Sequence, residues 1–306
     1  MDSASAIEGL VIDVERFALH DDPGIRSTVF LKGCPLLCQW CHNPESMDVR
    51  PQSLIRYDRC PDCLRSGHVC AFAVRLDMSG DDGDIVHDRD RAVVVDPAKC
   101  PHAAVRSVGR WRSVESVLRE VSEDMPFYAS SGGGMTISGG EPMQQFEFTR
   151  ALLTAAKAAR ISTCLDTSGY ASTRRYIALL PFVDLFLFDY KATDSDKHRT
   201  FTGVPNERIL ANLHKLLAHG AQIILRCPLV PGVNDDEGNL AGIADLSRRY
   251  PQFAGVEIMP FHNLGREKWR GLGVENPLVG LATAGLADRD GWASKLRAFG
   301  ARLIDG

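Results

Sequence analysis

Short apolar segments alternate with amphipathic segments along most of the chain after residue 110. The apolar, strand-like segments lie at residues 135–138, 161–165, 183–188, 222–229 and 256–259. The segments between them carry apolar residues at helical spacing; Val114, Val117 and Val121, for example, follow Ser113, a residue type that often caps a helix. Because parallel strands that are buried on both faces are continuously apolar, this alternation predicts a parallel sheet built from β/α units.

About six such units can be counted when the apolar residues 28–31 are included. A complete eight-unit barrel usually takes about 250 residues, and this region is shorter once the cysteine-rich residues 56–107 are set aside. The sequence therefore predicts an α/β protein with a partial (β/α)6 TIM-like barrel. We expect residues 1–55 to begin the barrel, residues 56–107 to form a small insert, and residues 108–306 to complete the barrel.

Charge and composition exclude several classes of protein. The 35 lysines and arginines against 39 aspartates and glutamates give a formal net charge of −4, which argues against a dedicated nucleic-acid binder. No apolar run reaches the roughly 18 residues of a membrane span, and the first eight residues lack the features of a signal peptide. We therefore expect a cytoplasmic protein whose nine cysteines stay reduced, so that clustered thiols are candidate metal ligands.

Seven of the nine cysteines fall between residues 34 and 100, and three of them form a Cys-x3-Cys-x2-Cys motif at Cys34, Cys38 and Cys41. A structural zinc site normally has four ligands, whereas an iron–sulfur cluster held by three cysteines leaves one iron open to an external ligand. His42 is not expected to be the fourth ligand, because two neighbouring side chains rarely converge on one tetrahedral centre. The motif therefore predicts a metal centre with an open position.

This motif, in which the aromatic Trp40 precedes the third cysteine, resembles the cluster motif of the radical S-adenosylmethionine (radical SAM) superfamily. Residues 17–35 and 41–46, the second including His42-Asn43-Pro44-Glu45, are similar to the opening of the activating enzymes of glycyl radical enzymes, such as pyruvate formate-lyase activase. The resemblance extends from about residue 11 to 270 in several separated motifs. One departure is Asp22, where that family usually carries glycine; it changes a loop but removes no ligand.

The resemblance implies a radical SAM oxidoreductase. Cys34, Cys38 and Cys41 would be its catalytic residues, because they would hold a 4Fe–4S cluster whose open iron is chelated by S-adenosylmethionine (SAM). Reductive cleavage of SAM would give a 5′-deoxyadenosyl radical, which would abstract a Cα hydrogen from a glycine of a partner enzyme. The implied partners are a glycyl radical enzyme and a reductant of the flavodoxin or ferredoxin type.

Polar residues follow several predicted strands, where β/α barrels place their active sites. By resemblance, Trp40 and the Ser138-Gly139-Gly140-Glu141 motif would contact SAM, with the carboxylate of Glu141 accepting from its amino group. The remaining residues that the resemblance implies around SAM are Asp166, Thr167, Asp189, Lys191, Arg226 and His262. Asp166, Thr167 and Asp189, with the carbonyl of Leu187, would hold a monovalent cation; Lys191 would neutralise the SAM carboxylate. Arg226, a charge inside an apolar strand, requires a partner.

A second group of cysteines comprises Cys60, Cys63, Cys70 and Cys100. Many activating enzymes carry a ferredoxin-like insert with eight cysteines here, so the four of this chain indicate a contracted insert with one centre. Cys100-Pro101 is typical of a ferredoxin cluster, which favours an auxiliary 4Fe–4S cluster. Four thiolates also suit zinc, and that alternative stays open. Cys164 and Cys227 are expected to be buried, inert thiols.

Two other functions are compatible with parts of the sequence. One is a radical SAM enzyme that acts on a small molecule or another macromolecule; the His42-Asn43-Pro44-Glu45 continuation and the insert favour an activating enzyme over it. The other is a zinc or iron–sulfur interaction module without enzymatic activity. The open three-cysteine motif and the later glycine-rich and charged motifs count against such a module.

The insert makes a metal-counting prediction. After anaerobic purification we expect about eight irons per chain, four at each of two clusters. Substituting Cys60 and Cys63 together should remove about four irons and leave the SAM-cleaving cluster in place. If this double substitution instead removes one zinc, with iron unchanged at about four, the auxiliary-cluster interpretation is wrong.

Overall fold

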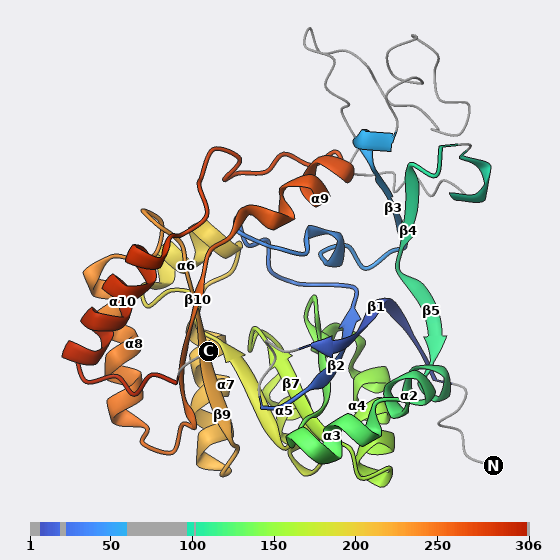
Figure 1. The fold of residues 1–306 in the computed structure, drawn as a ribbon. Coiled ribbons are helices and arrows are strands. Elements are labelled where there is room, and N and C mark those ends of the chain that lie inside the picture. The colour runs from blue at the N-terminus through green and yellow to red at the C-terminus, as the bar shows by residue number, and fades with distance from the viewer. Residues whose placement is uncertain (1–6, 19–22, 60–96, 101, 305–306) are drawn as a thin grey trace, which may run out of the picture.

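The computed structural model describes residues 7–18, 23–59, 97–100 and 102–304 (Figure 1). This part of the chain forms one eight-stranded sheet in the order β10-β9-β8-β7-β6-β2-β1-β5. Six of these strands run parallel, and they are β2 (Arg26–Leu31), β6 (Gly134–Gly139), β7 (Ser162–Thr167), β8 (Leu185–Asp189), β9 (Ile223–Leu229) and β10 (Gly255–Pro260). The predicted α/β fold with six parallel strands in an open barrel is therefore confirmed.

Two antiparallel strands extend the sheet beyond β2. β1 (Glu8–Ala18) pairs with β2 on one side and with β5 (Arg110–Ser113) on the other. Neither strand was expected from the sequence. β5 has only four residues, Arg-Trp-Arg-Ser, and one of them is apolar. The strand is therefore too short and too polar to show an apolar alternation in the sequence.

A separate two-stranded sheet flanks the cysteine-rich region. β3 (Gln52–Ile55) pairs antiparallel with β4 (Val105–Val108). Cys60, Cys63 and Cys70 lie outside the described residues, and the predicted insert with boundaries at 56–107 stays a prediction. Cys100 is described, and its Sγ accepts a hydrogen bond from the amide of Ala104 at 3.3 Å.

Most of the helices lie on the outside of the curved sheet, whereas α9 (Arg266–Gly271) lies beyond one end of it (Figure 1). The described helices are α2 (Val114–Ser122), α3 (Met125–Ser131), α4 (Phe146–Ala158), α5 (Thr173–Leu179), α6 (Ser195–Thr202), α7 (Glu207–Ala218), α8 (Glu237–Arg249), α9 (Arg266–Gly271) and α10 (Leu286–Ala298). Ser113 caps α2 as expected, since its side chain accepts from the amide of Ser116. None of the described helices is long and apolar enough to cross a membrane.

The two faces of the sheet carry different apolar clusters. Leu165, Phe186 and Leu225 belong to the large core between the sheet and the helices. Leu187 and Ile224 belong to a small cluster of their own, together with Cys164. Burial on both faces is the physical reason why these strands are continuously apolar in the sequence. Cys164 and Cys227 are buried in these clusters, as predicted.

A buried carboxylate ties β1 and β2 to α3. Asp124, which precedes α3, is completely buried, and the Nε atom of Arg16 lies 3.0 Å from both of its oxygens. The hydroxyl of Ser27 also donates to Asp124, at 2.7 Å, and accepts in turn from Tyr128. The hydrogen bond from Arg16 lowers the pKa of Asp124 below its ordinary value.

We expect Asp124→Ala to lower the free energy of unfolding by about 1–3 kcal/mol, because it removes the buried acceptor of Ser27 and leaves Arg16 paired with Glu123 alone. Urea unfolding at pH 7 measures the loss. The pKa of Asp124 is depressed in the folded state, so its contribution is complete above the unfolded carboxyl pKa of about 4 and is lost as the pH falls further. The stabilities of the wild type and the variant should therefore converge below about pH 4.

Asp245→Ala is the matched control, because Asp245 pairs with Arg249 on the exposed face of α8. Exposed pairs contribute little to stability, so this variant should unfold close to the wild type. An Asp124→Ala variant as stable as Asp245→Ala would contradict the assigned role of Asp124.

Candidate active site

A cavity of about 190 Å³ lies at the carboxyl ends of the parallel strands. It brings together most of the residues that the sequence singled out, and they are Cys34, Cys38, Trp40, Cys41, Gly139, Gly140, Asp166, Thr167, Asp189, Lys191 and Arg226. These residues come from the loop after β2 and from the ends of β6, β7, β8 and β9. Their convergence follows from the parallel sheet, since the carboxyl ends of its strands meet at one edge.

A second hollow, of about 400 Å³, lies between the loops that follow β8 and β9. Lys197 and Asp236 form an ion pair there at 2.9 Å, and the side chains of Asn234 and Asn239 are bonded to surrounding backbone atoms. Its polar groups thus serve to hold the two loops together. The cavity with the cysteines is the better candidate for chemistry.

The backbone fixes the loop that carries the three cysteines, which we call the cysteine loop (residues 33–46). The amide of Gly33 donates to the carbonyl of Ser46 at 2.6 Å, and the amide of Cys34 donates to Met47 at 3.1 Å. Within the loop, the amide of Cys41 donates to the carbonyl of Cys38 at 3.1 Å. The loop is therefore closed at its base, and the cysteines extend from a fixed frame.

Burial raises the pKa values of all three thiols, that of Cys41 to about 12, and the charge of Cys38 adds to the increase for both Cys34 and Cys41. Thiols that disfavour one another's charge in this way need a cationic centre to ionise as ligands. No three Cys, His, Asp or Glu side chains within the described residues converge as they would around a single metal ion. The three cysteines instead border one cavity, an arrangement that fits a larger polynuclear cluster.

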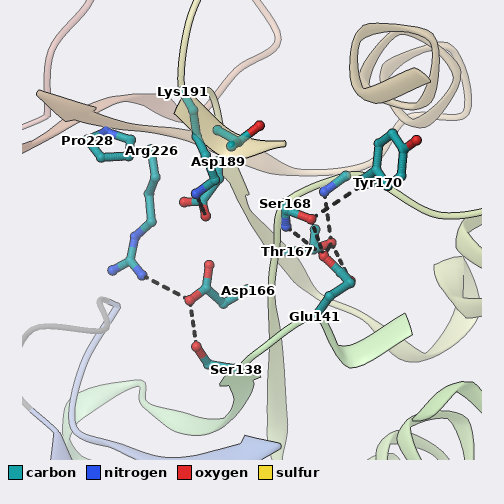
Figure 2. A network of polar contacts seen from close by, with 12 residues as sticks. Ser138, Glu141, Asp166, Thr167, Ser168, Tyr170, Asp189, Lys191, Arg226 and Pro228 are labelled. Carbon is teal, nitrogen blue, oxygen red and sulfur yellow. Dashed lines mark hydrogen bonds and ion pairs between the residues drawn. The ribbon is translucent and has the colours of Figure 1, made fainter. Parts of the chain in front are cut away.

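The strand ends supply a compact group of charges (Figure 2). The Nζ atom of Lys191 lies 2.6 Å from a carboxylate oxygen of Asp189. Arg226 approaches Asp166 to 3.8 Å, and Ser138 donates to the same carboxylate at 2.6 Å. Burial by itself lowers the pKa of Lys191, but the charges of Asp189, Cys38 and Asp166 and the hydrogen bond to Asp189 together raise the pKa above its ordinary value. Lys191 is therefore a permanent cation in the cavity wall.

Glu141 does not belong to this group. Its carboxylate is completely buried and accepts hydrogen bonds from the Thr167 hydroxyl at 2.9 Å and from the Ser168 hydroxyl at 2.6 Å and amide at 2.8 Å (Figure 2). Burial raises its pKa, although these hydrogen bonds oppose the shift. Because the carboxylate holds the loop after β7, the geometry does not support the expectation that it accepts from the SAM amino group.

The glycines of the same motif have a clear steric reason. Gly139 adopts a φ of +105°, and a Cβ there would lie 2.4 Å from backbone atoms of Leu31. A Cβ on Gly140 would lie 2.2 Å from the carbonyl oxygen of Gly33, at the base of the cysteine loop. Only glycine permits this close approach between the end of β6 and the cysteine loop.

His262 lies beside the cavity rather than in its wall. Its ring stacks on the ring of His42 with the centroids 3.6 Å apart, and His42 lines the cavity. Among the described residues, the buried Nδ1 of His262 and Nε2 of His42 have no hydrogen-bond partner. Burial lowers the pKa of both rings, that of His42 to about 4. The two neutral rings thus offer unsatisfied polar atoms at the edge of the cavity.

Two parts of the site were not expected from the sequence. Glu257 of β10 accepts a hydrogen bond from Nε of Arg226 at 2.8 Å; it carried the same signal as Arg226, a charge inside an apolar strand. The apolar wall of the cavity consists of Leu36, Pro228, Val230, Met259 and Phe261. Such residues cannot be distinguished in a sequence from those of an ordinary core.

The chain is similar to known proteins over most of its length. The family model described as the radical SAM superfamily matches residues 28–241. An isethionate sulfite-lyase activating enzyme of Nitratidesulfovibrio vulgaris is 40% identical over 280 residues, which cover 88% of this chain and 89% of that protein. A choline trimethylamine-lyase activating enzyme of Oleidesulfovibrio alaskensis is 36% identical over 296 residues, with 92% of each chain covered.

Similarity extends to further relatives and to solved structures. A benzylsuccinate synthase activating enzyme of Thauera aromatica is 37% identical over 270 residues, which cover 86% of this chain and 82% of that protein. The crystal structure of Streptococcus suis SuiB bound to the precursor peptide SuiA superposes with a TM-score of 0.50 at 13% identity, covering 88% of this chain and 45% of that chain. This last similarity concerns the fold alone.

We expect Lys191→Ala to weaken SAM binding about 10-fold to 100-fold, because it removes a charge-assisted contact at the cavity wall. Titration of the protein with SAM measures the affinity. Lys157→Ala is the matched control, since Lys157 forms an equally short pair with Asp184, at 2.6 Å, on the surface. Equal SAM affinities of the two variants would refute the role assigned to Lys191.

Proposed function

The chain belongs to the radical SAM superfamily and, within it, to the activating enzymes of glycyl radical enzymes, and on this basis we propose that it cleaves SAM reductively to install a glycyl radical on a partner enzyme. The observation that carries the proposal is a single cavity that holds three cysteines on one side and paired charges on the other. The cysteines can ligate an iron–sulfur cluster, and the paired charges can bind a zwitterionic cosubstrate.

Cys34, Cys38 and Cys41 fit a 4Fe–4S cluster. They come from one loop that is closed at its base, and their thiols need a cationic centre to ionise. Three protein ligands leave one iron for an external ligand. When bound, the cluster supplies the electron that splits SAM into methionine and the 5′-deoxyadenosyl radical, which abstracts the glycine Cα hydrogen.

The charges of the cavity wall fit the methionine part of SAM. Lys191 and Arg226 are cations that can bind its carboxylate, and the Asp166 carboxylate can accept from its ammonium group. We assign Asp166 and Asp189, with the backbone of Thr167 and the carbonyl of Leu187, to a monovalent cation beside the SAM carboxylate. The hydroxyl of Thr167 is already bonded to Glu141 and Tyr176.

The apolar wall fits the adenosine part. Trp40, Pro228, Val230, Met259 and Phe261 offer flat and apolar surfaces to an aromatic base. His42 also borders the cavity, and its Nε2 atom has no hydrogen-bond partner among the described residues, so we propose that it faces the adenosine part. The same apolar lining excludes water from the place where the radical would form.

The partner would present a glycine-containing loop to this cavity. The eight-stranded sheet begins with β10 and ends with β5, which are not paired with each other, and we propose that the loop enters on this open side of the barrel. The three relatives named above are activating enzymes of two lyases and a synthase, and we propose a partner of this class. We also propose a flavodoxin or ferredoxin as the reductant. An auxiliary 4Fe–4S cluster is proposed at Cys60, Cys63, Cys70 and Cys100, with zinc as the alternative. The proposed location is the cytoplasm, which keeps the thiols reduced.

Anaerobic reconstitution with iron and sulfide, followed by SAM and a reductant, tests the proposal. The wild type should release 5′-deoxyadenosine, and Cys34→Ala, Cys38→Ala and Cys41→Ala should each abolish the release, because each loss exposes a second cluster iron. Cys164→Ala, which removes a buried thiol outside the cavity, is the control. A cysteine variant of the motif that retains full cleavage with an intact cluster would contradict the assignment.

Incubation with candidate partners tests the second half of the proposal. Isethionate sulfite-lyase, choline trimethylamine-lyase and benzylsuccinate synthase form a suitable panel, and an electron paramagnetic resonance (EPR) spectrum detects a glycyl radical. Release of 5′-deoxyadenosine without a glycyl radical on any glycyl radical enzyme, but with a modified small molecule, would favour the alternative radical SAM function.

A further inference from the structure

A segment near the C-terminus packs against the cysteine loop from outside the cavity. Trp269 of α9 donates its indole N–H to the carbonyl oxygen of Cys41 at 3.0 Å. The indole is only 6% exposed, so this hydrogen bond is shielded from water. The acceptor is the backbone of the third expected cluster ligand, 228 residues away in the sequence.

Lys268, the preceding residue, binds the same loop two and four residues further on. Its Nζ atom donates to Oδ1 of Asn43 at 2.6 Å and pairs with Oε1 of Glu45 at 2.7 Å. The side chain of Glu45 is only 3% exposed, and Oε2 has no hydrogen-bond partner among the described residues. A buried carboxylate in this position depends strongly on its cation.

Close packing accompanies these polar contacts. A Cβ on Gly265, directly before α9, would lie 2.9 Å from the carbonyl oxygen of His42 and 3.3 Å from that of Cys41. The ring of His262 stacks on the ring of His42 in the same region. One segment, residues 262–269, thus contacts the loop from Cys41 to Glu45 in three ways. It binds the backbone of the loop, binds its side chains and packs closely against it.

We propose that Trp269 and Lys268 are positioning residues for the iron–sulfur cluster, an inference that rests on the proposed function. Neither residue lines the cavity. They act through the peptide of Cys41 and through Asn43 and Glu45, and so fix the direction in which the Cys41 thiolate meets its iron. Groups that orient metal ligands from behind typically change metal affinity 10-fold to 100-fold when they are removed.

The same contacts explain two residues that follow the cysteine motif. Asn43 and Glu45 belong to the His42-Asn43-Pro44-Glu45 continuation of the cysteine motif. Their side chains turn toward Lys268, and the backbone carbonyl of Glu45 accepts from the buried Lys32 at 2.6 Å. Asn43 and Glu45 therefore form the surface to which α9 binds.

Trp269→Phe tests the indole contact, because phenylalanine keeps an aromatic ring in place but has no N–H donor. Trp292→Phe is the matched control: Trp292 of α10 is also buried and donates one indole hydrogen bond, to Asp235 at 3.2 Å. The full chain is reconstituted anaerobically, and the EPR signal that changes on addition of SAM is identified. An iron chelator is then added, and the loss of this signal is followed over time. This signal reports the SAM-binding cluster alone, and thermal unfolding is measured in parallel.

We expect Trp269→Phe to lose the SAM-responsive signal about 10-fold faster than Trp292→Phe, with a similar decrease of the unfolding temperature in the two variants. Equal rates of loss in the two variants would overturn the inference. A wild type that binds no iron at Cys34, Cys38 and Cys41 would instead overturn the proposed function, so the two failures are distinguishable.

Lys268→Met provides a second test that does not depend on the folding of the tryptophan variant. It should also accelerate loss of the signal, because it leaves Glu45 buried without its cation. Adding Glu45→Gln should recover part of the retention, since the neutral amide carries no uncompensated charge. Lys157→Met, which breaks a surface pair, should behave as the wild type. A Lys268→Met variant that retains the cluster as long as Lys157→Met would overturn the role of Lys268.

Discussion

The in-register parallel pairing of β7, β8, β9 and β10 is the constraint on which the site depends. Asp189 pairs with Arg226, and Arg226 pairs with Glu257 on the next strand. In-register neighbours on parallel strands point to the same face, so these three side chains form one row across the sheet. Asp166 enters the same group from β7 (Figure 2). A shift of one residue in any pairing would turn part of the row into the apolar core.

A row of charges inside a barrel is tolerable only when each charge has a partner. Arg226 is nearly buried and lies between Glu257 and Asp166, and Lys191 is held by Asp189. This pairing gives each charge a partner within the protein. The cavity therefore presents fixed cations and carboxylates to a zwitterionic molecule, and little reorganisation is needed when such a molecule binds.

The cysteine loop depends on contacts from three distant parts of the chain. Its base is closed by backbone hydrogen bonds around Gly33, one side is packed by the end of β6 at Gly140, and its outer side is held by Trp269 and Lys268. Glu141 joins the end of β6 to the loop after β7. The three cysteines are contributed locally, but the frame that aims them is assembled only in the complete barrel.

The sequence by itself determined the six parallel β/α units, the cysteine motif and most of the cavity residues, because apolar periodicity and short motifs are local properties of a chain. It could not determine the direction of Glu141, whose oxygens are claimed by Ser168 and Thr167 rather than by the cavity. Nor could it reveal the partnership of Arg226 with Glu257 or the contact of Trp269 with Cys41. Each of these joins residues that lie 26 to 228 positions apart. Only the tertiary structure decides such contacts, because the burial and pairing of a polar group depend on every element that packs around it.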